Sequence, residues 1–160
     1  ALRILENCPD GCDRSCYRCL RSYKNKFEHD LLDRHLGASL LRFALRGTAP
    51  TIDAGRLERS TDLLFQDLER HGVEGLHLER NAPVAVPGLS SVMVPILATN
   101  RQGARYVIGL HGPLTPDDPP DAGLRELKEF AATLPVVLID ELVVRRNLPS
   151  ATADLIERLG

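Results

Sequence analysis

The first 46 residues combine a helical hydrophobic pattern with a stretch of turn-forming residues. In the second half of this segment an apolar residue recurs every three or four positions, at Leu32, Leu36, Leu40 and Phe43. This spacing predicts an amphipathic helix over residues 27–46. Asn25 is suited to cap its start, and Gly47 to end it. The stripe is the expected buried face of this helix.

The rest of the chain alternates helical and strand-like patterns after a linker at residues 47–55. The expected elements are a helix at 57–71, strands at 84–86, 91–99 and 105–110, a Pro-rich loop at 112–121, a helix at 122–134, a strand at 136–139 and a helix from Pro149. Residues 100–103 are expected to form a hairpin turn, and Pro95 predicts an edge strand or a bulge. We therefore predict an α+β protein with domains at 1–46 and 56–160.

Composition and charge support this division. The chain has 160 residues, 43% of them hydrophobic and 26% charged, which is typical of a globular protein. Residues 1–46 hold nine Lys or Arg and six Asp or Glu, whereas the whole chain has a net charge of −2. No apolar run is long enough to span a membrane, so we expect no membrane partner. The chain begins without Met, and we expect it to be a piece of a longer protein.

Four cysteines within twelve residues give the strongest chemical signal. Cys8, Cys12, Cys16 and Cys19 are the only cysteines in the chain. The two-residue gap between Cys16 and Cys19 is typical of a knuckle that supplies two ligands from one turn, and Cys8 and Cys12 can supply the other two. The spacing favours a structural Zn²⁺ site, because four thiolates complete a tetrahedron.

Two other interpretations of the cysteines stay open from the sequence. Disulfides would close loops of only a few residues, although small secreted domains normally use them to join distant segments. An iron–sulfur cluster also takes four thiolates. Zinc is favoured over both, and it indicates an intracellular, cytoplasmic protein.

Basic and aromatic residues alternate within and after the cysteine cluster. The candidates for contact with nucleic acid are Arg14, Arg18, Arg21, Tyr23, Lys24 and Lys26. Positive charge suits phosphates and aromatic rings suit base stacking. The same composition also fits a plain surface with the rings packed under the knuckle, so DNA binding is a hypothesis here.

The run CDRSCYRCLRSYKNKFEHDLLDRHLGASLL, residues 12–41, resembles the zinc-binding C-terminal domain of bacterial DEAD/DEAH-box DNA helicases of the mitomycin-repair and DISARM antiviral-defence types. The resemblance lies in the cysteine knuckle, in CLRSYKN at residues 19–25 and in HDLLDR at residues 29–34. It implies zinc on the four cysteines and a parent protein that uses ATP to move on DNA. The side chains that can tie the knuckle to the following helix are those of Asn25, His29, Asp33 and Arg34.

The second segment resembles the restriction-endonuclease-like fold in its order of elements, but its strands lack the acids of an active site. Such nucleases need an Asp on the second strand and an acid-x-Lys on the third, which together hold the metal ion. Here Gly109 and His111 stand where the acid and Lys are wanted. Asp140 and Glu141 follow the last strand without a Lys, and are expected to be solvated or to cap a helix.

Three functions remain open from the sequence. The first is a non-catalytic zinc module of a DNA helicase or helicase-associated defence protein, which would contact DNA, motor domains or a partner subunit. The second is a metal-dependent nuclease, and the third is a protein-docking module that never contacts DNA. ATP hydrolysis is not expected in this chain, because it has no Gly-rich phosphate loop.

Overall fold

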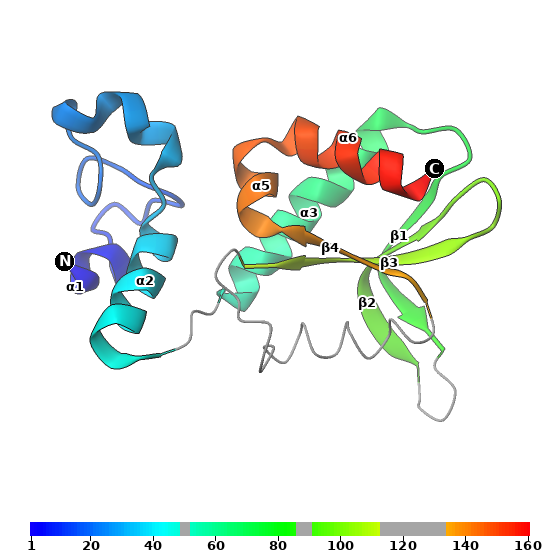
Figure 1. The fold of residues 1–160 in the computed structure, drawn as a ribbon, viewed down its shortest axis with the longest axis horizontal. Helices are drawn as coiled ribbons and strands as arrows, with labels where there is room; N and C mark the ends of the chain where they lie inside the picture. The colour runs from blue at the N-terminus through cyan, green and yellow to red at the C-terminus, as the bar shows by residue number, and fades with distance from the viewer. Residues whose placement is uncertain (49–51, 86–90, 113–133) are drawn as a thin grey trace. The chain divides into compact units, whose positions relative to one another are not determined.

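The computed structural model describes residues 1–48, 52–85, 91–112 and 134–160, and the chain divides into two compact units, Ala1–Thr51 and Ile52–Gly160 (Figure 1). Unit 1 contains helix α1 (Leu2–Glu6), the 3₁₀ helix η1 (Tyr23–Leu31) and helix α2 (Arg34–Arg46). Unit 2 contains α3 (Ala54–His71), β1 (His77–Val84), β2 (Val92–Thr99), β3 (Arg105–His111), β4 (Val136–Asp140), α5 (Glu141–Arg146) and α6 (Leu148–Leu159). The predicted α+β class is confirmed.

The single helix predicted over residues 27–46 is wrong, because the chain breaks between η1 and α2. Leu32 is extended (φ −78°, ψ 125°), and Asp33 caps the next helix by accepting hydrogen bonds from the backbone amides of His35 (2.9 Å) and Leu36 (3.1 Å). A side-chain acceptor of this kind satisfies amides that have no partner in the first turn. The predicted cap at Asn25 is also wrong, since this residue lies inside η1. Gly47 does end α2, in the left-handed conformation (φ 65°).

The apolar stripe of α2 is not its buried face within unit 1. Leu40 is 49% exposed and Phe43 is 55% exposed, whereas the buried residues of the helix are Ala38 and Ser39. A Cβ added at Gly37 would lie 3.3 Å from Leu5 Cδ1, so α1 approaches α2 where the side chains are small. Small residues on the buried face let two short helices come close, and leave the larger side chains outside.

The sheet of unit 2 has the strand order β1-β2-β3-β4. The first three strands are antiparallel neighbours, and β4 runs parallel to β3, with Val107 beside Val136 and His111 beside Asp140. The predicted hairpin between β2 and β3 is confirmed. Its turn is closed by a hydrogen bond from the Asn100 amide to the Ala104 carbonyl, and Gly103 adopts φ 80°.

The first strand differs most from its prediction. It begins at His77, seven residues before the predicted start at Val84, and residues 86–90 lie outside the described part. Its polar composition fits an edge strand, which is paired on one side alone. The predicted edge position of Pro95 is wrong, because β2 lies between β1 and β3. The pairing of β2 with β3 covers Ile96 to Thr99 and does not include Pro95. Pro95 is accommodated because no backbone amide is needed at its position for this pairing.

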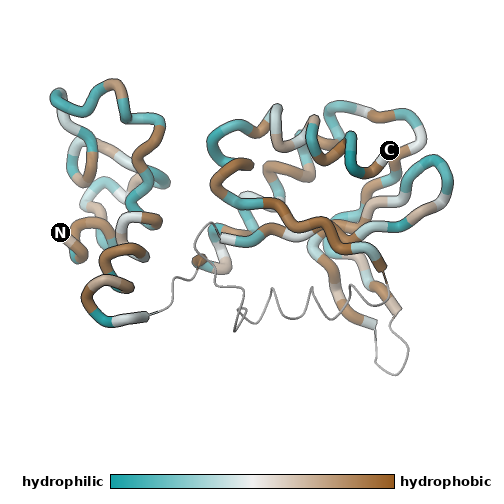
Figure 2. Tube along the Cα trace, in the orientation of Figure 1, coloured by the Kyte–Doolittle hydropathy of each residue, from teal (hydrophilic) through white to brown (hydrophobic). Residues whose placement is uncertain are grey.

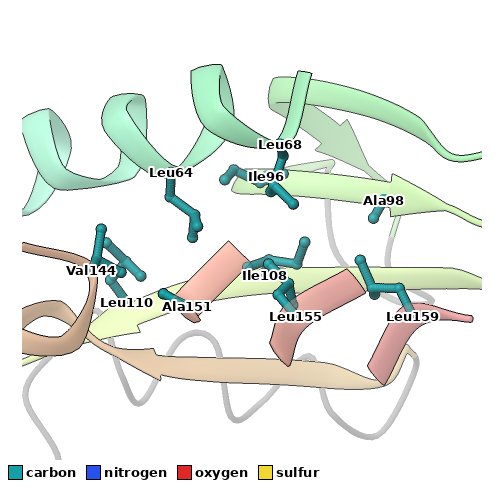
Figure 3. Close-up of a cluster of buried hydrophobic side chains, with 10 residues drawn as sticks. All are labelled: Leu64, Leu68, Ile96, Ala98, Ile108, Leu110, Val144, Ala151, Leu155 and Leu159. Carbon is teal, nitrogen blue, oxygen red and sulfur yellow. The ribbon is translucent and has the colours of Figure 1, made fainter. Parts of the chain in front are cut away.

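Helices α3, α5 and α6 lie on one face of the sheet and form the main hydrophobic core with it (Figures 1 and 3). The buried members of this core are Leu64, Leu68, Ile96, Ala98, Ile108, Leu110, Val144, Ala151, Leu155 and Leu159. A second buried cluster consists of Ala82, Val84, Val94, Leu97 and Val107. The strand predicted at 136–139 is confirmed as β4, a continuous hydrophobic run in Figure 2. The predicted loop and helix at 112–134 fall almost entirely outside the described residues.

Candidate metal centre

The four cysteines lie on two tight turns that follow α1. The first turn is closed by a hydrogen bond from the Gly11 amide to the Cys8 carbonyl (2.9 Å), and Gly11 adopts φ 57°, which favours glycine. In the second turn the amides of Cys19 (3.1 Å) and Arg21 (2.9 Å) both donate to the Cys16 carbonyl. Both turns therefore fold back on themselves and bring the side chains of each cysteine pair to one side.

The four sulfur atoms are spaced as ligands of one ion. The Sγ–Sγ distances are 3.4 Å for Cys8–Cys16, 3.6 Å for Cys8–Cys12, 3.6 Å for Cys12–Cys19 and 3.8 Å for Cys16–Cys19, and all four atoms lie within 4.8 Å of one another. Sulfurs placed about 2.3 Å from a central tetrahedral zinc lie about 3.8 Å apart. All four cysteines are free, so the group could hold a metal ion.

The surroundings of the sulfurs shift the pKa values of three of the thiols in different directions. Burial raises the pKa of Cys8, but hydrogen bonds from the Asp10 and Cys12 amides and from neighbouring thiols outweigh it and lower the pKa to about 6. Desolvation, followed by the nearby sulfur of Cys19, raises the pKa of Cys12. Desolvation likewise raises the pKa of the Cys16 thiol. Of these three thiols, Cys8 is thus the easiest to deprotonate, and Cys12 and Cys16 would release their protons when a metal binds.

Arg34 connects the turns to the helices around them. Its Nε donates to the Cys12 carbonyl (2.6 Å), and its Nη1 donates to the carbonyls of Leu5 (2.7 Å) and Glu6 (3.1 Å). Its backbone amide donates to the Arg14 carbonyl (2.7 Å). One guanidinium therefore satisfies carbonyls at the end of α1 and in the first turn, which fixes the turn relative to both α1 and α2.

Asn25 and His29 join η1 to the second turn. Asn25 Nδ2 donates to the Leu20 carbonyl (2.9 Å), and its Oδ1 accepts from the Ser22 amide (2.7 Å). His29 Nε2 lies 3.0 Å from the Ser22 carbonyl and 3.2 Å from Asn25 Oδ1. Asp33 contributes as the cap of α2. The break between η1 and α2 thus decides which backbone groups these side chains contact.

The six basic and aromatic candidates fall into two groups. Arg14 Nη2 donates to the Asp30 carbonyl, and Arg21 Nε donates to Ser15 Oγ (2.9 Å), so both side chains are held within unit 1. The other four are exposed, namely Arg18, Tyr23, Lys24 and Lys26. The Nζ of Lys26 lies 5.0 Å from the ring centroid of Tyr23 and 4.8 Å from that of Phe27. Phe27, the ring that follows this basic stretch, lies four residues after Tyr23 and is also exposed.

In unit 2 the acidic residues beside β4 serve the fold. Asp140 caps α5 by accepting a hydrogen bond from the Leu142 amide (2.8 Å), as expected. The expectation that Glu141 is solvated or a cap is wrong. It is fully buried, and its carboxylate accepts from Arg56 (2.8 and 2.9 Å), Ser60 (2.7 Å) and Arg145 (3.1 Å). Across the described residues, the one group able to hold a metal ion is the cysteine cluster.

No helix in the described part of the chain combines the length and apolar character needed to cross a membrane. Comparison with known proteins finds a similarity confined to a segment. Over 49 residues the chain is 51% identical to the Druantia protein DruE of Escherichia coli (strain UMEA 4076-1), which is 31% of this chain and 3% of that protein. No family model and no solved structure matches the chain. The chain is thus similar, over part of its length, to a small segment of a far longer protein.

Proposed function

We propose that this chain is a structural zinc-binding module of a longer DNA helicase or helicase-associated antiphage-defence protein. The observation that carries the proposal is the group of four sulfurs within 4.8 Å, held on two hydrogen-bonded turns, the first of which Arg34 braces. Thiolate ligands select zinc over calcium or magnesium, which prefer oxygen. Sulfur spacings of 3.4 to 3.8 Å support one tetrahedral ion and are too long for disulfides.

The metal is proposed to stabilise the fold and not to catalyse a reaction. A catalytic zinc keeps one position open for water or substrate, whereas four thiolates fill the tetrahedron. His29, the histidine of the HDLLDR segment, has its Nε2 beside Ser22 and Asn25. The ion then takes the place of a hydrophobic core in unit 1, and the unit presents a fixed surface to DNA or to motor domains.

The helicase context rests on the sequence motif, and the defence context rests on the similarity to the Druantia protein. The motif of residues 12–41 resembles the zinc domain of such helicases, and the similarity to the Druantia protein covers 3% of that protein's length. Both support a module within a much larger chain. We propose that the parent's ATP hydrolysis lies in residues outside this chain, and that this chain works in the cytoplasm with DNA, with the motor domains or with a defence partner subunit.

The nuclease alternative receives no support from the described strands. Gly109 lies inside β3, and His111 ends it beside Asp140, whose carboxylate is used as a helix cap. We propose that unit 2 is a non-catalytic relative of the restriction-endonuclease-like fold that serves packing or docking. Magnesium-dependent cleavage of a supercoiled plasmid by the purified chain would contradict this proposal.

Elemental analysis of the purified chain tests the metal site. We expect one zinc per chain in the wild type and loss of zinc in Cys12→Ser. His29→Ala and His35→Ala are matched controls, and both should keep one zinc, because neither imidazole is a proposed ligand. Absence of stoichiometric zinc, iron in its place, or loss of zinc in a histidine variant that stays folded would overturn the four-cysteine zinc site.

A further inference from the structure

Two aromatic rings on η1 are exposed to solvent and lie near the same lysine ammonium. Tyr23 is 78% exposed and Phe27 is 85% exposed. The Nζ of Lys26 lies within 5.0 Å of both ring centroids, so the two rings border the same ammonium group. Large aromatic side chains are normally among the most buried groups in a protein. We call Tyr23, Lys26 and Phe27 the aromatic ledge.

The segment that leads into the ledge is basic. Residues 17–27 contain four basic residues and no Asp or Glu, while Glu28 and Asp30 follow on η1 and are exposed. The Arg21 side chain is bonded to Ser15, whereas Arg18, Lys24 and Lys26 are exposed. Three exposed basic side chains close to two exposed rings in sequence are complementary to a polyanion that also carries flat apolar faces.

The ledge is held in place by the metal knuckle. Asn25 lies between the two rings in sequence, and it bonds both the Leu20 carbonyl, directly after the second cysteine turn, and the Ser22 amide. His29 Nε2 lies 3.0 Å from the Ser22 carbonyl on the following turn. The backbone that carries the rings is therefore fixed before any ligand arrives, which lowers the ordering cost of binding.

We propose that the aromatic ledge binds single-stranded nucleic acid, with bases stacked on Tyr23 and Phe27 and phosphates at Arg18, Lys24 and Lys26. The proposal deepens the proposed function, since the zinc knuckle positions the ledge. Single strands are favoured over duplexes because their base faces are free to stack, whereas a duplex covers its own. Stacking has little sequence preference, so the ledge holds any unpaired strand, as a module next to a nucleic-acid motor requires.

Fluorescence anisotropy with the zinc-loaded 160-residue chain tests the ledge. The probes are a labelled dT strand of about 15 nucleotides, near the upper site size of a single-strand-binding module, and a dA·dT duplex of the same length. We expect the single strand to bind more tightly, and Tyr23→Ala or Phe27→Ala to weaken its binding by about 5- to 150-fold for each stacked base lost. Tyr23→Phe should stay near wild type, because stacking needs the ring and not the hydroxyl.

Phe43→Ala is the matched control. This variant removes an exposed phenyl ring of the same kind from α2, where Phe43 is 55% exposed. It should leave the affinity for the dT strand close to that of wild type. A second arm measures the slope of the logarithm of the binding constant against the logarithm of the salt concentration. For single strands each phosphate contact contributes about −0.7 to this slope. Lys24→Gln combined with Lys26→Gln should therefore reduce the slope by about 1.4.

Zinc content separates the two proposals. If every variant keeps one zinc and Tyr23→Ala with Phe27→Ala still binds the dT strand like wild type, the ledge proposal is wrong and the zinc module stands. Equal binding of strand and duplex, or no binding of either by the wild type, would also overturn it and leave the ledge as a protein-docking surface. A chain without zinc would overturn the module itself, whatever the oligonucleotide results.

Discussion

The two units of this chain are stabilised in different ways. In the described part of unit 2, ten buried residues from three helices and two strands form one hydrophobic core, and a second cluster adds five more. In the described part of unit 1, the buried hydrophobic residues are Leu5, Cys8 and Ala38. Unit 1 also exposes Leu40 and Phe43, large side chains that would supply a core if they were buried.

The difference shows what replaces a core when a segment is too short to build one. In domains below about 70–80 residues a hydrophobic core alone rarely supplies enough stability, and natural examples often add a metal or disulfides. In unit 1 the polar framework is detailed, since Arg34, Asn25 and Asp33 each bond backbone groups of another segment or of a helix end. These bonds orient the turns, and the proposed zinc supplies the free energy that burial supplies in unit 2.

Removing the metal should give the largest difference between the units. Structural zinc sites of this kind contribute about 10–16 kcal/mol of apparent binding free energy. Chelation, or Cys12→Ser, should therefore unfold unit 1 and leave unit 2 folded. Amide hydrogen exchange is the measurement: protection should be lost across residues 1–48 and kept in β2, β3 and α6.

The zinc-loaded wild type in the same buffer without chelator is the control. Loss of protection in both units together would show that unit 2 depends on the knuckle. Protection kept in unit 1 after complete metal removal would show that its hydrogen-bond framework suffices alone. Either result would contradict the proposal that zinc stabilises unit 1 and that hydrophobic burial stabilises unit 2.

The buried carboxylate of unit 2 gives the next largest effect. Glu141→Gln should destabilise unit 2 by about 3–5 kcal/mol, because breaking a buried ion pair leaves the remaining charge uncompensated. In this variant a neutral amide would replace a carboxylate that bonds both Arg56 and Arg145. Urea denaturation followed by circular dichroism measures the change, and zinc content should stay at one per chain.

Glu58→Gln is the matched control for Glu141. Glu58 also pairs with an arginine, Arg80, but its side chain is 58% exposed. Exposed ion pairs contribute roughly 0–1 kcal/mol, so this variant should be close to wild type. Equal losses in the two variants would mean that burial does not decide the effect, and a loss of zinc in Glu141→Gln would mean that the units are energetically coupled.

The sequence predicted what local patterns encode. The cysteine spacing located the four sulfurs that converge, because ligands within twelve residues can meet through turns alone. Alternation and turn residues predicted β2, the hairpin and β3, and the hydrophobic run predicted β4. The edge strand β1 was largely missed, since an edge strand carries polar residues on its exposed side and lacks a strong apolar signal.

Features that join distant residues could not be predicted in this way. Arg56 and Glu141 lie 85 residues apart, so neither gives a sign of its burial in the sequence. The break before α2 had a local signal, an Asp followed by helix-forming residues, but the longer apolar stripe outweighed it in the interpretation. Within unit 1 the part of that stripe formed by Leu40 and Phe43 is exposed. Periodicity alone gives no information about what a helix face contacts.

The Arg34 brace should have a moderate effect confined to unit 1. Arg34→Lys keeps the charge, but a single ammonium cannot reach the carbonyls of Cys12, Leu5 and Glu6 in the planar arrangement of a guanidinium. Leaving such carbonyls without a partner costs about 1–3 kcal/mol. Competition with a chromophoric zinc chelator should show a corresponding loss of zinc affinity.

Arg42→Lys is the control for this brace. Arg42 pairs with Glu6 at the surface, with 37% of its side chain exposed, and the substitution should leave zinc affinity unchanged. If Arg34→Lys bound zinc as tightly as wild type, the turns would be positioned by the cysteines alone. Unit 1 would then be organised by its metal without help from the polar framework.

The smallest expected effect is at Phe43. Because 55% of this residue is exposed, Phe43→Ser should change the stability of unit 1 by less than about 0.5 kcal/mol, whereas truncating a buried Phe costs about 3–5 kcal/mol. The measurement is again hydrogen exchange in α2 of the zinc-loaded chain. A loss near the larger value would mean that the stripe of α2 is covered in solution, and that unit 1 draws on hydrophobic burial after all.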